Sequence, residues 1–195
     1  PPRAAWLRAL LLERERIANH LGDLGALGND AGFGVGLAQF SRLKEDLLRL
    51  NERAFGARYP MDAVVAGGVA QDLPAEAAAA LLAQGETLGA EAAALRAIYD
   101  EHAGLQDRFI GAGRVPTDLA RELGLTGFAA RASGIALDLR CDMPVAPYDA
   151  VPVTRAADTD GDVAARVAVR FDELSESLRL CGELLRTLPG GASRL

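Results

Sequence analysis

The chain has 195 residues, half of them hydrophobic, and its 21 basic and 27 acidic side chains leave a formal net charge of −6. This length and composition are those of a single globular domain and exclude a disordered chain. The acidic balance, with both signs interspersed, argues against nucleic-acid binding, which needs a basic surface.

No apolar run approaches the roughly 18 residues of a membrane span, so we expect no direct membrane span. The first residues do not have the pattern of a signal peptide, and we expect none. Cys141 and Cys181 lie far apart and form no CxxC pair, which predicts neither a disulfide framework nor a cysteine metal site. A reducing, cytoplasmic setting fits these features.

The first half of the chain reads mainly as helix. Leucines at helical spacing predict a helix from Pro2 to about Gly28, and the glycines of residues 28–34 predict a break. A second helix is predicted over Gly36–Phe55, with Gly56 as its C-terminal cap. Residues 60–71 hold a short β-branched run followed by two glycines, which predicts a short strand and a turn.

The next helix is predicted from Pro74 to about His102, with Asp72 as its N-terminal cap. It is rich in alanine and carries leucine anchors. Residues 103–116 favour irregular structure, with a short extended piece around Phe109 and Ile110.

The following segment is poor in periodic structure. Thr117 is expected to cap a brief helix, Asp118–Leu123, that Gly124 ends. Residues 124–148 read as loops, which in a compact domain are usually functional or packed against something. Residues 151–155 are predicted to form one strand.

Helical periodicity returns from Asp162 to Leu188, with Asp162 as cap and Cys181 on the apolar seam as an inert core thiol. The predicted fold class is therefore mainly α: a helical bundle-like domain with at most one small β-hairpin or short strands. We expect residues 1–195 to form a single helical domain.

Residues 13–36 carry two stripes when read as a helix. The polar stripe consists of Glu13, Arg16, His20, Asp23 and Asp30. The small-residue stripe consists of Ala18, Gly22, Gly25, Gly28, Gly32 and Gly36. Each helical glycine costs roughly 1 kcal/mol relative to alanine, so the second stripe predicts close contact with another backbone. The polar stripe has two interpretations, a buried polar track or a solvated face, and the residues alone favour the solvated face.

Three possible motifs do not meet their requirements. Residues 158–162, DTDGD, lack the glycine and glutamate positions of an EF-hand and predict a turn instead. Residues 32–36, GFGVG, follow a helix and not a strand, unlike a dinucleotide fingerprint. Ser41 and Ser133 lack the sequence context of a hydrolase nucleophile.

Several blocks, in order and spacing, carry a resemblance to a known family. They are ERERIANHLGDLGALGNDAGF, FSRLKEDLLRLNERAFGARYPMD, AGGV, TGFAARASGIALDLR, PYDAV, and DGDVAARVAVRFDELSESL ending in LPGG. Together they resemble the large subunit of membrane-bound nickel–iron hydrogenases of the formate hydrogenlyase type. They are also similar to the homologous 49-kilodalton, quinone-site subunit of respiratory complex I. The first two blocks lean toward the hydrogenase branch.

The resemblance implies an oxidoreductase that moves electrons between a redox substrate (protons and hydrogen, or quinone) and iron–sulfur clusters. The implied partners are an iron–sulfur small subunit and membrane-arm subunits, in a complex on the cytoplasmic, inner face of the cell membrane. Hydrogenases of this family hold nickel and iron through two CxxC pairs, and this sequence has neither. We therefore expect no metal or cofactor on this chain, which would be the central part of a longer subunit. The alternative is a noncatalytic helical scaffold.

The resemblance also singles out site residues. Asp30 corresponds to an aspartate that, in the complex I branch, pairs with a quinone-site histidine and aids proton coupling. That histidine has no counterpart here. Glu13 and His20 complete the candidates for a proton or quinone path, and burial would require their stripe to be a paired network.

Overall fold

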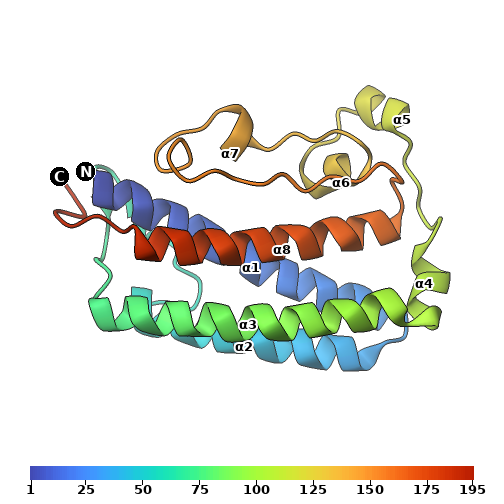
Figure 1. Ribbon diagram of the computed structural model, residues 1–195, viewed down its shortest axis with the longest axis horizontal. Helices are drawn as coiled ribbons and strands as arrows, with labels where there is room; N and C mark the ends of the chain where they lie inside the picture. The colour runs from blue at the N-terminus through green and yellow to red at the C-terminus, as the bar shows by residue number, and fades with distance from the viewer.

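The computed structural model describes residues 1–195, and its architecture is a four-helix bundle. The long helices are α1 (Pro2–Asp30), α2 (Gly34–Phe55), α3 (Ala75–Glu101) and α8 (Val163–Arg186). They run alternately up and down, with both chain termini at one end (Figure 1). Helix α1 packs against α2 and α8, and α3 closes the bundle against the same two helices. The mainly α prediction is confirmed, and no helix combines the length and apolarity needed to cross a membrane.

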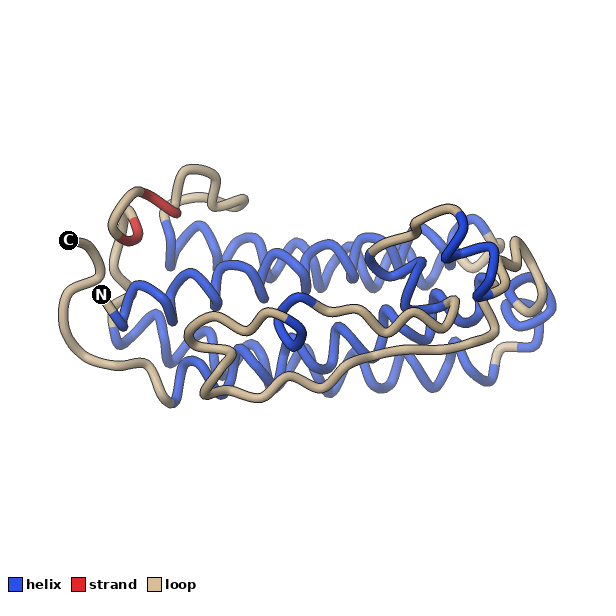
Figure 2. The backbone as a smooth tube through the Cα atoms, turned by 90° about the horizontal axis from the view of Figure 1, so that it is seen from above, coloured by secondary structure: helices blue, strands red, loops and turns tan.

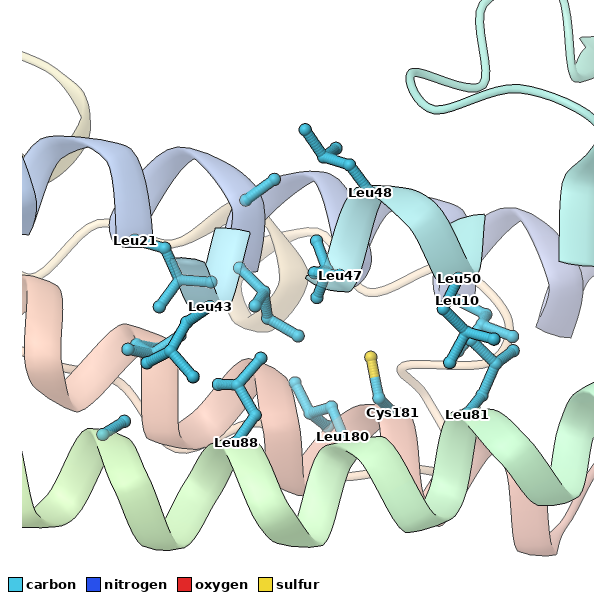
Figure 3. Packing of buried hydrophobic residues seen from close by; sticks show 14 of the residues in the cluster. Leu10, Leu21, Leu43, Leu47, Leu48, Leu50, Leu81, Leu88, Leu180 and Cys181 are labelled. Atoms are coloured by element: carbon cyan, nitrogen blue, oxygen red, sulfur yellow. The ribbon is translucent and has the colours of Figure 1, made fainter. Parts of the chain in front are cut away.

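The core of the bundle is built from leucines that all four helices contribute. Leu10, Leu47, Leu81 and Leu180 lie together in it, and Cys181 points its sulfur into the same space (Figure 3). Burial raises the pKa of the Cys181 thiol to about 12. The prediction of an inert core thiol at this position is confirmed.

The helix ends follow the sequence signals in part. Gly56 ends α2 with a left-handed φ of 78°, and the Asp162 carboxylate accepts a hydrogen bond from the Ala165 amide at 2.8 Å, as predicted. Two predicted caps are wrong. Asp72 instead accepts from its neighbour Leu73 and from Arg3, while Thr117 is itself the first residue of α5.

The only sheet is a two-stranded antiparallel hairpin, β1 (Val64–Val65) and β2 (Gly68–Val69). Arg8 of α1 donates to the carbonyls of Val65 and Gly68, which fixes the hairpin to the bundle. The C-terminal residues pair with the same hairpin, since Leu195 donates to the Gly67 carbonyl at 3.1 Å. The predicted strand and turn within residues 60–71 are thus confirmed.

Four short helices connect α3 to α8: α4 (Ala103–Phe109), α5 (Thr117–Glu122), α6 (Gly127–Ala132) and α7 (Leu139–Asp142). The prediction of irregular structure is wrong for residues 103–109, which form α4, and is confirmed for residues 110–116; of the predicted extended piece only Ile110 is extended. His102 Nδ1 caps α4 by accepting from the Leu105 amide at 3.2 Å, and Gln106 donates to the Tyr99 carbonyl at 2.8 Å. These contacts join α4 to the end of α3, which the periodicity of seven residues could not reveal.

Residues 127–161, which we call the covering segment, lie along α1 and α8 (Figures 1 and 2). The strand predicted over residues 151–155 is absent. Its backbone is bound by side chains of α8 instead: Thr154 donates to Glu176 at 2.7 Å, and Arg179 donates to the Pro152 carbonyl at 2.7 Å. Side chains thereby provide the partners that a neighbouring strand would otherwise supply.

The small-residue stripe of α1 makes the predicted close contact, but mostly with side chains. A Cβ at Gly25 would lie 3.1 Å from Phe40 Cβ and 3.5 Å from the Leu37 backbone. One at Gly22 would meet the Lys44 ammonium, and one at Gly28 would collide with the Tyr99 hydroxyl. A Cβ at Gly28 would also lie 3.5 Å from the backbone oxygen of Phe33. Gly25 and Gly28 therefore both lie against another part of the backbone as predicted, whereas the nearest atoms to Gly22 all belong to the Lys44 side chain.

Candidate functional site

The centre of the candidate site is Glu13, whose side chain is completely buried between α1, α8 and the covering segment. Arg140 Nη1 donates to both of its carboxylate oxygens at 2.9 Å. The hydroxyls of Tyr148 and Ser177 donate to it at 2.6 and 2.7 Å. Glu13 thus joins α1 to side chains that lie between 127 and 164 residues further along the chain.

Arg140 is held from its other side by Asp138. Its Nε and Nη2 atoms donate to the two Asp138 oxygens at 3.0 and 2.7 Å, in the bidentate geometry that guanidinium and carboxylate groups favour. Burial alone would raise the pKa of Asp138, but the Arg140 charge outweighs it and lowers that pKa to about 2. The carboxylates of Asp138 and Glu13 likewise raise the pKa of Arg140 against the opposing effect of burial.

Glu173 of α8 forms a second centre. Arg16 Nη2 lies 2.8 Å from its carboxylate, and Arg131 donates to the other oxygen. His20 Nε2 lies 3.0 Å away but is poorly aligned for a hydrogen bond, so we treat this contact as electrostatic. Burial opposes ionisation of Glu173, yet His20, Arg131 and Arg16 together lower its pKa to about 2.

Arg16 links the two centres, because its Nε atom lies 3.7 Å from Glu13 and 3.4 Å from Ser177 Oγ. We call the connected set the charged seam; its members are Glu13, Arg16, His20, Arg131, Asp138, Arg140, Tyr148, Glu173 and Ser177. Three carboxylates face three guanidinium groups, so the seam is neutral when His20 is uncharged. Such pairing is what makes the burial of so many charges tolerable.

The structure decides between the two interpretations of the polar stripe. Glu13 and His20 are buried, with 0% and 7% of their surface exposed, and Arg16 is mostly covered. The solvated interpretation is therefore wrong for these three residues. The paired network that the family resemblance implied for them is confirmed.

Asp23 and Asp30 do not join the seam. Asp23 is half-exposed and pairs with Arg170 Nε at 3.0 Å, while the Arg170 guanidinium also stacks on the Phe128 ring. Asp30 is exposed and is the last residue of α1, at the corner before α2. The structure therefore brings Glu13 and His20 into one network and leaves Asp30 outside it.

Sequence reasoning did not single out six members of the seam. Arg131, Asp138 and Arg140 lie in the block TGFAARASGIALDLR, Tyr148 lies in PYDAV, and Glu173 and Ser177 lie in RFDELSESL. One signal was available: Glu173 and Ser177 are four residues apart, so they share a face of α8 that adjoins its apolar seam. The other four residues lie in the short helices and loops of residues 127–148, which are too short to give a periodicity from which burial could be predicted.

The residues of this chain do not fit a nickel–iron centre. No three His, Cys, Asp or Glu side chains converge as metal ligands. Cys181 is buried in the leucine core with its pKa raised to about 12, and half-buried Cys141 has its sulfur 3.5 Å from the Val153 carbonyl. Neither thiol belongs to a set of the kind that holds such a metal.

The fold and the site together define the class of protein, a four-helix bundle with buried ion pairs under a long covering segment. The family can also be stated. The chain belongs to the family described as respiratory-chain NADH dehydrogenase, 49 Kd subunit, whose model matches residues 30–195.

The similar proteins come from both branches that the sequence resembles. Formate hydrogenlyase subunit 5 of Escherichia coli K12 is 32% identical over 191 residues, which cover 98% of this chain and 34% of that protein. The NADH-ubiquinone oxidoreductase 49 kDa subunit of Cafeteria roenbergensis is 32% identical over 192 residues, covering 98% of this chain and 48% of the relative. The predicted resemblance is therefore confirmed.

A solved structure agrees with the fold over the whole chain. A chain of the membrane-bound sulfane sulfur reductase, an archaeal respiratory membrane complex, matches with a TM-score of 0.93 at 28% identity. The match covers 100% of this chain and 52% of the other. The chain thus spans between about a third and a half of the length of these relatives.

Proposed function

We propose that this chain acts within the large subunit of a respiratory oxidoreductase complex. The subunit would pass electrons between a redox substrate, either protons and hydrogen or a quinone, and iron–sulfur clusters of a partner subunit. The observation that carries this proposal is the full-length structural match to a subunit of a respiratory membrane complex. Membership of the 49-kilodalton family supports it.

The proposed partners are an iron–sulfur small subunit and membrane-arm subunits. This chain would be cytoplasmic, in a complex peripheral on the inner face of the cell membrane. Relatives named as subunits of formate hydrogenlyase, of NADH-ubiquinone oxidoreductase and of a membrane-bound reductase support this placement.

Asp30, His20 and Glu13 are the proposed proton-path or quinone-path residues of this chain. Asp30 is an exposed carboxylate at a helix corner, where a neighbouring subunit or a substrate can reach it. His20 has an imidazole nitrogen without an aligned hydrogen bond, and imidazole is well suited to proton transfer near neutral pH. Glu13 is fully bonded, so its contribution is to keep the charges around it in place.

Asp30→Asn in the assembled complex tests the proposal, because it removes the charge and keeps the shape. A lost proton carrier typically costs 10²–10⁴-fold in rate, so we expect turnover to fall by about that factor. Two assays cover the two substrate classes: hydrogen evolution from reduced methyl viologen, and NADH-dependent reduction of a short-chain quinone. Complex assembly and cluster content should be unchanged.

Asp107→Asn is the matched control, since Asp107 is an exposed aspartate of α4 and forms no ion pair. It should leave turnover unchanged. Normal turnover of Asp30→Asn with normal assembly would contradict the proposed role of Asp30 and assign this residue to capping or packing. An assembled wild-type complex with neither activity would contradict the proposed function and favour a noncatalytic scaffold.

We further propose that any nickel–iron centre of the parent subunit is held outside this chain. The separation of the two thiols and their surroundings support this. Metal analysis of residues 1–195 alone, purified from medium that contains nickel and iron, should find no stoichiometric nickel. Nickel retained in the protein and lost on replacement of Cys141 or Cys181 would contradict it.

A further inference from the structure

Tyr99 connects α3 to the corner between α1 and α2. Its side chain is completely buried, and its hydroxyl donates to the Leu24 carbonyl of α1 at 2.8 Å. The ring meets Phe40 and Phe171 edge-on, at centroid distances of 5.7 and 5.5 Å. These contacts anchor the ring in the core, so the hydroxyl occupies a fixed point beside α1.

Two glycines make room for this hydroxyl, one on each side of the corner. A Cβ at Gly28 of α1 would collide with Tyr99 Oη, and so would a Cβ at Gly36 of α2. Glycine is unfavourable inside a helix, and both positions are helical. The two glycines therefore form a notch that fits the tyrosine of α3.

Phe33 closes the corner over the same tyrosine. Its ring packs edge-on against Tyr99 with centroids 5.7 Å apart. Its amide donates to the Gly28 carbonyl at 2.7 Å, and its carbonyl accepts from the Gly36 amide at 3.0 Å. The whole path from Gly28 to Gly36 is thus folded around the Tyr99 side chain.

Asp30 lies inside that path, two residues after Gly28 and three before Phe33. It makes no hydrogen bond or ion pair of its own through its side chain, and only three residues separate it from α2. The position of Asp30 beside α2 is therefore set by the corner backbone. We propose that Tyr99 is the positioning residue for Asp30. This inference rests on the role proposed above for Asp30.

The first test is Tyr99→Phe in the assembled complex, which keeps the ring and removes only the hydroxyl. A misplacement of about 1 Å can cost about 10²-fold in rate, and a single lost hydrogen bond should move the corner by less. We expect kcat to fall about tenfold in the assay that responds to Asp30→Asn, with KM nearly unchanged. Tyr59→Phe is the control, because Tyr59 is half-exposed and lies outside the bundle core; its turnover should be normal.

Combining variants separates positioning from general structural damage. In the Asp30→Asn background, Tyr99→Phe should cause no further loss of turnover, because the residue it positions is already inactive. An independent tenfold loss in that background would overturn the inference. If Asp30→Asn lowers turnover and Tyr99→Phe does not, the positioning role fails while the proposed function stands. If Asp30→Asn is itself normal, the proposed role of Asp30 fails, and this inference fails with it. If the assembled wild-type complex has neither activity, the proposed function fails.

A second pair tests the notch without reference to Asp30. Gly28→Ala should lower the thermal midpoint of the protein, and Tyr99→Phe should recover part of that loss because the colliding hydroxyl is gone. An equal loss in both backgrounds would show that Gly28 does not accommodate Tyr99, and would overturn the structural basis of the inference.

Discussion

The two sides of α1 solve the same burial problem in different ways. The side facing α8 buries polar and charged groups, among them Glu13 and His20, against polar side chains from distant parts of the chain. The side facing α2 and α3 has no side chain at Gly25 and Gly28, and neighbouring helices fill that space.

The two sides of α1 therefore determine different features of the fold. Charged groups must find definite partners, so the charged seam fixes the covering segment, whose backbone has little regular structure. Glycines specify only distance, so their side fixes how closely α2 and Tyr99 approach. Removing the partner of a buried charge should therefore lower the free energy of unfolding more than adding a methyl group at one of these glycines.

The largest expected effect is that of Glu13→Ala. The change would leave Arg140, Tyr148 and Ser177 without their shared acceptor, and breaking a buried pair typically costs about 3–5 kcal/mol. Chemical denaturation should show this loss in the free energy of unfolding. Glu15→Ala, at an exposed position of the same helix, is the control and should change it by less than about 0.5 kcal/mol. Equal effects would mean that the seam contributes nothing beyond helix propensity.

Acid should weaken the charged side next. The pKa of Glu173 is about 2 in the fold against an ordinary 4.5, so the folded state binds fewer protons than the unfolded state between these values. Glu173 contributes on the order of 3 kcal/mol to the free energy of unfolding above pH 4.5, and this contribution is lost as the pH falls toward 2. Asp138 acts in the same direction.

Denaturant midpoints measured between pH 5 and 2 test this expectation. Glu173→Gln should flatten the pH dependence, whereas Glu86→Gln at an exposed site of α3 should not. An unchanged slope in Glu173→Gln would place the acid sensitivity elsewhere.

Gly28→Ala should have the largest effect on the glycine side, though smaller than Glu13→Ala. Overpacking typically costs about 1–3 kcal/mol, and the added methyl group meets the fixed Tyr99 hydroxyl. Thermal unfolding would measure the loss. A higher midpoint in Gly28→Ala would show that this side is loosely packed.

Gly85→Ala should have the smallest effect, and it should raise the free energy of unfolding where Gly28→Ala lowers it. Gly85 lies in α3 beside a groove of about 300 Å³ between α3 and α8, and no atom lies within 4 Å of an added Cβ. Better helix propensity should stabilise the protein by up to about 1 kcal/mol. Destabilisation here would mean that glycines of this fold are constrained even where no contact is seen.

The long helices were predictable because their periodicity is local and strong. The break after Asp30, the cap at Asp162 and the place of Cys181 followed from residue spacing. The failures share a cause: α4 depends on its junction with α3, and residues 151–155 take side-chain partners from α8. The first contact is polar and joins residues seven positions apart at a helix junction, the second joins residues 22 positions apart, and hydrophobic periodicity reports neither.

The sequence by itself determined that this is a mainly α chain, that α1 carries a polar and a small-residue stripe, and that its motifs resemble one family. Only the tertiary structure decided that Glu13 and His20 are buried while Asp30 is exposed, and that Gly28 faces a tyrosine hydroxyl. The physical reason is distance along the chain. Arg140 and Ser177 reach Glu13 across 127 and 164 residues, and a helical stripe shows which residues share a face without showing what covers them.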